Sequence, residues 1–111
     1  MPLVALAEEV AERYFREFPD DLEGYSAEVR DWAVHDTQYI LAWALAELGG
    51  TPILLDRAEW LGRVLAGRGF PLERLARNLE LTAGVLAARA PEHAAALERM
   101  LGEAAAAVRA L

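Results

Sequence analysis

The chain has 111 residues, of which 55% are hydrophobic, and it carries a formal net charge of −7 at pH 7. Its length predicts one domain over residues 1–111, and its lack of cysteine excludes disulfides, thiolate nucleophiles and cysteine-ligated zinc sites. Its negative charge disfavours nucleic acids and anionic membrane surfaces as partners, because both attract positive side chains.

The acidic charge is concentrated in the first third of the chain. Residues 1–36 contain ten acidic residues and three arginines, whereas residues 37–111 contain eight of each. A basic protein partner at this acidic third is therefore allowed. The opening Met1-Pro2-Leu3 lacks the charged start of a signal peptide. Charges also interrupt every apolar stretch before it reaches the length of a membrane span, so we expect a cytoplasmic protein.

The first predicted helix runs from about Pro2 to Phe18, and Pro19 ends it. Its apolar residues recur at helical spacing: they are Leu3, Leu6, Val10, Tyr14 and Phe18. Residues 19–24 are predicted to form a polar turn.

The second predicted helix runs from about Ser26, a natural N-cap, to Leu48, where Gly49-Gly50 ends it. One arc of this helix carries the apolar residues Val29, Trp32, Ala33, Ile40, Trp43 and Ala44. The arc roughly opposite carries Val34, Leu41, Leu45 and Leu48. A helix that is apolar on two sides is buried on two sides. We therefore predict that this helix is central in the fold, or that it is central and also forms a dimer face.

Three further helices follow in close succession. Thr51-Pro52 predicts an N-cap and the first helical position of one helix, Phe70-Pro71 begins the next, and Ala90-Pro91 begins the last. Links this short make neighbouring helices antiparallel or steeply crossed. The sequence therefore predicts an all-α fold, a compact bundle of four or five helices.

The last helix carries small and apolar residues in a heptad-like pattern. The repeating positions are Leu97, Leu101, Ala104 and Val108. Small side chains allow two helices to approach closely, and a regular stripe gives them a seam. We predict that these four residues form the interface of a homodimer.

Asp36 is the leading candidate for a binding residue, because it lies within the aromatic arc of the second helix, one turn from Trp32 and Ile40. An unpaired carboxylate in such surroundings destabilises a fold unless it is protonated or paired. One interpretation is a ligand anchor in an aromatic pocket, formed by Trp32, Asp36, Tyr39, Trp43 and Trp60. The other is a structural residue that accepts a hydrogen bond from a neighbouring side chain or pairs with an arginine such as Arg57.

Residue patterns for catalysis and for metal binding are missing from the sequence. The single serine, Ser26, has no histidine–aspartate partner set, and no glycine pattern matches a phosphate-binding or dinucleotide-binding loop. His35 shares a helix face with Asp31 and Glu28, but a metal would need further ligands. We predict no enzymatic activity, no metal site and no cofactor, and a metal or haem oxidoreductase is the least favoured class.

The segment 60–73 reads WLGRVLAGRGFPLE and is followed by Leu79-Glu80 and Val85-Leu86. With its tryptophan and its Arg68-Gly69-x-Pro71-Leu72-Glu73 turn, it resembles helical regulatory modules of bacterial sensor proteins. These are the globin-like N-terminal domains of stressosome-type regulators and the helical modules beside cobalamin-binding domains, in which such a hinge joins two helices. The cobalamin-binding loop motif is missing here, so the resemblance implies no cofactor contact. It implies a regulatory or sensory helical domain and leaves open whether the fold is globin-like.

The sequence leaves two functions open. The first is a non-enzymatic regulatory or protein-interaction module that forms a homodimer. The alternative is a small-molecule sensor that binds an apolar ligand in the tryptophan-lined pocket, with Asp36 as its polar anchor.

Overall fold

The computed structural model describes residues 2–24 and 28–111, and α-helices account for most of them. The helices are α1 (Leu3–Glu17), α2 (Pro19–Gly24), α3 (Val29–Leu48), α4 (Leu54–Gly67), α5 (Leu72–Arg89) and α6 (Ala94–Arg109), with a turn of 3-10 helix at Pro91–His93 before α6. No strand occurs among the described residues. The predicted all-α bundle is confirmed, with α2 as a helix beyond the expected four or five.

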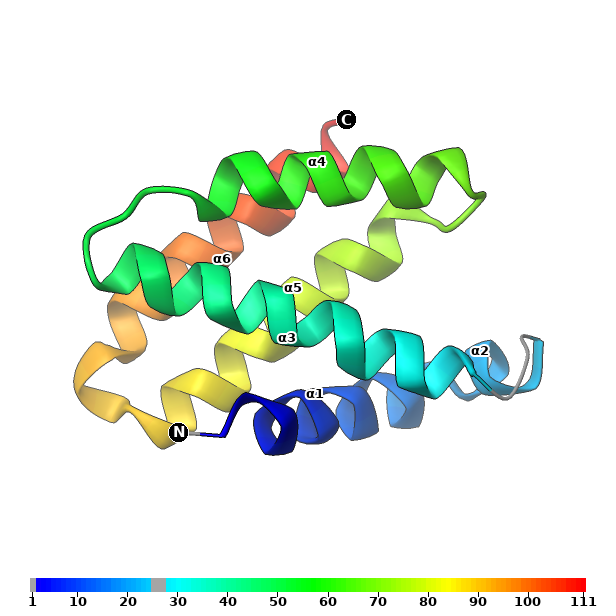
Figure 1. Cartoon of the computed structure of the whole chain (residues 1–111), viewed down its shortest axis with the longest axis horizontal. Helices are drawn as coiled ribbons and strands as arrows, with labels where there is room; N and C mark the ends of the chain where they lie inside the picture. The colour runs from blue at the N-terminus through cyan, green and yellow to red at the C-terminus, as the bar shows by residue number, and fades with distance from the viewer. Residues whose placement is uncertain (1, 25–27) are drawn as a thin grey trace.

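The helices pack in two layers. Figure 1 shows α1, α3 and α4 crossing the front of the molecule, with α5 and α6 behind them as an antiparallel pair. The molecule measures 38 × 28 × 18 Å, and its shortest dimension corresponds to two helices of about 10 Å each. The front helix α3 contacts each of the other five α-helices. The prediction that this helix is central in the fold is therefore confirmed.

The stripe on α6 lies in the core of the molecule. Leu97, Leu101, Ala104 and Val108 are each 0% exposed, because α6 packs against both α4 and α5 of the same chain. A side chain already covered by its own fold cannot meet a second copy. The prediction that these four residues form a homodimer interface is therefore wrong.

The ends of α5 and α6 are joined by charged side chains on the surface. The Arg109 guanidinium donates hydrogen bonds to Glu73 at 2.8 and 2.9 Å and to Glu80 at 3.0 Å. These hydrogen bonds lower the pKa of both carboxyl groups. Arg77 continues the network, since it contacts Glu80 at 3.4 Å and Glu17 of α1 at 2.8 Å.

The structure differs from the sequence-based prediction at two places, a predicted turn and a predicted helix start. Residues 19–24 form the short helix α2 instead of a turn, since Pro19 suits a first helical position and the acidic residues after it suit a helix N-terminus. The helix predicted after Thr51 starts at Leu54, and the N–H of Leu54 donates to Glu47 Oε1 at 3.1 Å. The predicted N-cap Ser26 lies outside the described residues. Among the described helices, none is both long and apolar enough to cross a membrane.

Candidate ligand-binding cavity

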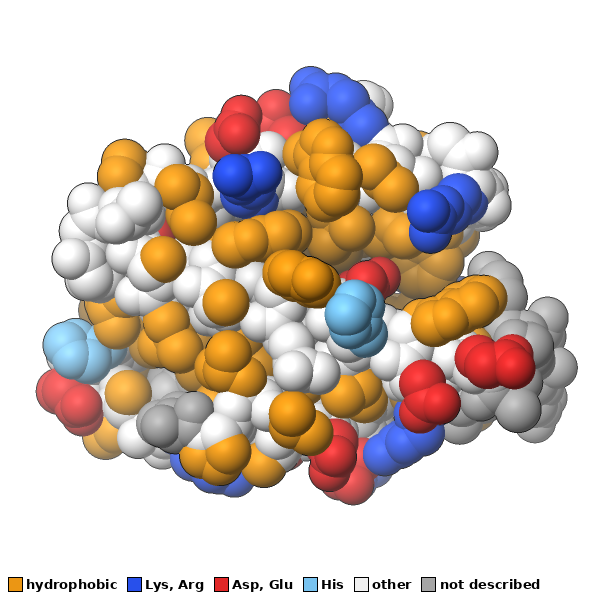
Figure 2. Space-filling model, in the orientation of Figure 1, with side chains coloured by type: hydrophobic (Ala, Val, Ile, Leu, Met, Phe, Trp, Pro, Cys, Tyr) orange, Lys and Arg blue, Asp and Glu red, His pale blue; other side chains and the backbone are white. Residues whose placement is uncertain are grey.

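A cavity of about 360 Å³ lies where α1, α2, α3, α5 and the α4–α5 turn converge. This volume is in the lower part of the ~300–1,000 Å³ range of ligand pockets. The cavity is reached from solvent beside Trp32 and Arg68, both of which are exposed. Figure 2 shows this face hollowed next to a histidine and an acidic side chain.

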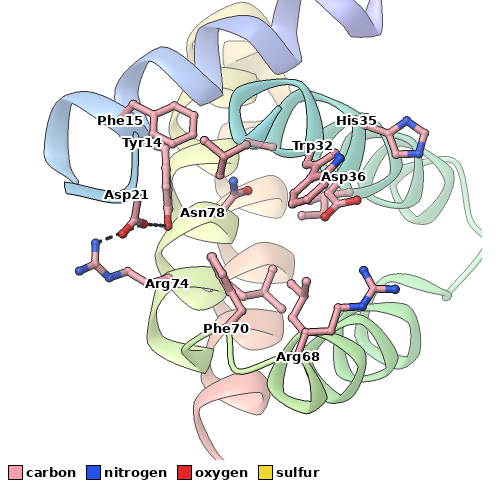
Figure 3. A pocket seen from close by; sticks show the side chains of 15 residues that line it. Tyr14, Phe15, Asp21, Trp32, His35, Asp36, Arg68, Phe70, Arg74 and Asn78 are labelled. Carbon is pink, nitrogen blue, oxygen red and sulfur yellow. Dashed lines mark hydrogen bonds and ion pairs between the residues drawn. The ribbon is translucent and has the colours of Figure 1, made fainter. Parts of the chain in front are cut away.

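The interior wall of the cavity is apolar. Its side chains come from five parts of the fold: Phe15 of α1, Ile40 of α3, Leu65 of α4, Phe70 of the α4–α5 turn and Leu75 of α5. The turn positions Phe70 because Gly69 adopts a φ of +81°, a conformation that side-chain-bearing residues rarely take. The Phe70 N–H then bonds back to the Leu65 carbonyl at 2.9 Å. Figure 3 shows the Phe70 side chain directed into the space below Asn78.

Asp36 is a polar group of the cavity whose side chain has no partner among the described residues. Within the described part of the chain its carboxylate is half-buried and makes neither a hydrogen bond nor an ion pair. Burial raises the pKa of Asp36, and the positive charges of His35 and Arg68 offset part of this effect. Figure 3 shows the carboxylate beside the Trp32 ring, one helical turn earlier on α3. The structural alternative for Asp36, a residue bonded to Arg57 or to a neighbouring donor, is therefore not what the structure contains.

The opposite wall of the cavity is closed by an internal charge cluster. The Tyr14 hydroxyl donates to Asp21 Oδ2 at 2.5 Å, and Arg74 Nη1 lies 3.5 Å from the same oxygen. The Arg74 guanidinium also lies over the Phe18 ring, 3.8 Å from its centroid, which is within cation–π range. These contacts join α1, α2 and α5, so the charges on this wall are already engaged with one another.

Asn78 is a buried polar residue in the lining of the cavity, and its side chain is hydrogen-bonded within the protein. Asn78 Nδ2 donates to Thr37 Oγ1 at 3.3 Å, and Thr82 Oγ1 donates to the Asn78 carbonyl at 2.9 Å. All three residues are buried, and they link α3 to α5. Buried polar groups are normally satisfied in this way, which makes the unpartnered Asp36 stand apart from them.

The structure brings only part of the predicted aromatic site together. Trp32 and Asp36 line the cavity, whereas Tyr39, Trp43 and Trp60 do not. Tyr39 is exposed and contacts His35 and Trp43, with ring centroids 5.2 and 6.1 Å apart. Trp43 packs on the core, and Trp60 is exposed on α4. The prediction of a pocket lined by three tryptophans is therefore wrong, because Trp32 and Trp43 lie about three helical turns apart along α3 and Trp60 lies on the exposed side of α4.

A second, shallower hollow lies between α1 and α3, lined by Glu8, Arg30, Asp31, Val34, His35 and Gln38. It includes Asp31 and His35, which were considered as metal ligands from the sequence. In the described residues, no three histidine, aspartate or glutamate side chains are grouped closely enough to hold a metal ion.

Any function assigned to this chain depends on its fold and on the cavity, because no related protein was found. The resemblance of segment 60–73 to globin-like and other helical regulatory modules stays a prediction. No protein-family model, curated protein or solved structure matches the chain.

Proposed function

We propose that this chain is a small-molecule-binding regulatory domain, whose ligand places an apolar body in the cavity and a polar group at Asp36. The observation that carries this proposal is a cavity of ligand size with an unpartnered carboxylate in its wall. A half-buried charge without a partner destabilises a fold, and such groups concentrate at functional sites. A ligand that supplies the missing partner would account for its presence.

The proposed function is binding without a chemical step. Among the described residues that line the cavity, there is no serine, threonine or lysine that could act as a nucleophile. Figure 3 shows the His35 ring directed away from the space that Asp36 faces, so the two do not form an acid–base pair across a bound molecule. A sensor-like role also agrees with the regulatory function that the resemblance of segment 60–73 implies. We propose a globin-like arrangement of the helices on the same basis.

A fluorescence titration with N-phenyl-1-naphthylamine, a neutral apolar dye, tests whether the cavity accepts a ligand. We expect saturable binding of one dye per chain, and we expect Ala33→Phe to abolish it by filling the cavity. The matched control is Ala42→Phe, which adds the same ring to an exposed position of α3. Equal dye binding by both variants, or none by the unmodified chain, would contradict the proposal.

A second candidate function is a protein-interaction module that forms a homodimer through α3 and α4. The observation in its favour is the exposure of large apolar side chains on these helices, with Tyr39 53% exposed and Trp60 54% exposed. Figure 2 shows apolar side chains spread over α3 and α4 on the face nearest the viewer. Exposed apolar patches mark interaction sites when they are large.

Sedimentation velocity over a concentration series tests the homodimer. We expect a concentration-dependent dimer that Trp60→Ser weakens, whereas Val4→Ser, an equally exposed apolar position on α1, leaves it unchanged. A chain that stays monomeric at all concentrations would exclude this second candidate.

The acidic first third is less available to a basic partner than its sequence indicates. Glu9 contacts Arg89 at 2.6 Å and Arg13 at 3.3 Å, and Glu17 contacts Arg77 at 2.8 Å. Arginines of α5 therefore neutralise part of the negative charge of α1 within the chain itself. A basic protein partner at this surface stays a prediction, and we favour ligand binding in the cavity over it.

A further inference from the structure

The charges at the mouth of the cavity define the ligand more closely, and this inference rests on the proposed function above. We propose that the ligand is an apolar α-amino acid, or a close amine–carboxylate zwitterion, whose ammonium group binds Asp36 and whose carboxylate binds Arg68.

The first step is that two opposite charges face the same opening and remain unpaired. Asp36 of α3 and Arg68 of the α4–α5 turn both line the cavity, and they lie close enough to influence each other electrostatically. In the described part of the chain neither side chain forms a hydrogen bond or an ion pair, with the other or with any other residue. Figure 3 shows their side chains on the same side of the cavity, across a gap.

The second step is that Asp21 and Arg74, on the opposite wall of the cavity, already form an ion pair with each other, although Arg74 Nη1 makes no hydrogen bond. Asp21 accepts from Tyr14 and lies against Arg74, and Arg74 covers the Phe18 ring. A ligand charge placed there would have to displace these contacts. Asp36 and Arg68 are therefore the groups that a ligand can bind without breaking the wall of the cavity.

The third step is the fit between this arrangement and an α-amino acid. Such a molecule carries both charges on one carbon, so both stay at the mouth while its side chain enters the apolar interior. The Trp32 ring beside Asp36 adds a surface that favours an ammonium group. A simple amine would leave Arg68 unpaired, and a simple carboxylic acid would bring its negative charge close to that of Asp36.

An NMR titration of the ¹⁵N-labelled chain with four probes of one shape tests the inference. The probes are L-phenylalanine, phenethylamine, which lacks the carboxylate, 3-phenylpropionate, which lacks the ammonium group, and the neutral 2-phenylethanol. We expect L-phenylalanine to bind about tenfold more tightly than phenethylamine or 3-phenylpropionate, and by a larger factor than 2-phenylethanol, with shifts of the Trp32 indole N–H signal. A difference of this size corresponds to one net charge-assisted hydrogen bond.

Two variants assign the charges to their partners. Asp36→Asn should remove the preference for L-phenylalanine over 3-phenylpropionate while keeping that over phenethylamine, and Arg68→Gln should do the reverse. Arg57→Gln is the matched control, because it removes an exposed arginine of α4 that does not line the cavity. Equal loss of both preferences in Arg57→Gln would contradict the assignment.

The outcomes separate this inference from the proposed function. If N-phenyl-1-naphthylamine binds the cavity but phenethylamine, 3-phenylpropionate or 2-phenylethanol binds as tightly as L-phenylalanine, the zwitterion is wrong and the binding domain stands. If Ala33→Phe leaves the binding of the dye and of L-phenylalanine unchanged, both proposals are wrong. Tight binding of L-phenylalanine that Ala33→Phe abolishes supports both.

Discussion

At the scale of single residues, Asp36 shows how a binding site opposes stability. Burial raises its pKa in the folded chain, so the folded state holds the carboxyl proton more tightly than the unfolded state does. Stability from this group is therefore fully present below the ordinary carboxyl pKa. It is lost as the pH rises through the raised pKa of the folded state.

Asp36→Asn should consequently stabilise the unliganded chain at neutral pH. The amide removes a charge that lacks a partner, and the gain should shrink when the pH falls below the ordinary carboxyl range. Thermal unfolding followed by circular dichroism at pH 7 and pH 3 measures both effects. Glu98→Gln, an exposed position on α6, is the control, and a melting temperature of Asp36→Asn at or below that of the unmodified chain at pH 7 would rule this account out.

Gly62 is a second residue whose local surroundings predict a measurable effect. A Cβ added to it would lie 2.8 Å from Leu111 Cδ1 and 3.4 Å from Leu72 Cδ2, so the glycine allows the chain end to pack against α4. Alanine in place of a helical glycine favours the helix by about 0.5–1 kcal/mol. We expect Gly62→Ala to deliver this gain only when Leu111→Ala has removed the obstructing methyl group. Urea denaturation of the two single variants and the double variant measures the coupling, and simple additivity would contradict it.

At the scale of whole elements, α6 is the helix on which the core depends. Leu101 is fully buried between α4 and α5, and removing a buried leucine side chain costs about 2–5 kcal/mol. Leu101→Ala should lower the free energy of unfolding by this amount in urea denaturation, and Leu101→Glu should prevent folding. Ala106→Glu, at an exposed position of α6, should change little. If Leu101→Glu folds and changes the oligomeric state, this expectation is wrong. The homodimer interface predicted on α6 from the sequence would then be supported.

The contact between the ends of α5 and α6 should depend on pH and salt. Hydrogen bonds from Arg109 lower the pKa of Glu73 and Glu80. The stability that they confer is therefore present above the ordinary glutamate pKa, and it is lost as the pH falls through the lowered values. Arg109→Gln should destabilise the chain at pH 7 and have no effect near pH 2. Thermal unfolding should also show a smaller effect in 1 M salt, where exposed charges are screened, and an effect independent of pH would show that packing is responsible.

At the scale of the whole molecule, helical periodicity predicted the buried stripe of α6 but not what buries it, and Trp32 on the predicted apolar arc of α3 is 59% exposed. The stripe of Leu97 and Leu101 on α6 suits a partner helix from the same chain as well as one from a second copy. Trp60 sits between the buried Ala58 and Leu61, yet its ring is exposed, since a residue type does not fix the direction of a side chain on a half-covered helix.

The candidate site was predictable only where its signal is local. Asp36 interrupts an apolar arc of its own helix, so the sequence identified it. Arg68 and Asp21 gave no such signal, because their positions depend on contacts between segments far apart in the chain. The α4–α5 turn brings Arg68 opposite Asp36, and α5 brings Arg74 against Asp21.

The packing of α6 against α4 and α5 also governs how the chain is made. This helix follows the other five, yet the core between α4 and α5 cannot close until it has left the ribosome. At roughly 5–20 residues per second, about 5–20 seconds separate the synthesis of α1 from that of α6. Until α6 emerges, the apolar faces of α4 and α5 lack their main partner, so nascent chains of this protein should be substrates for chaperones that hold exposed apolar segments.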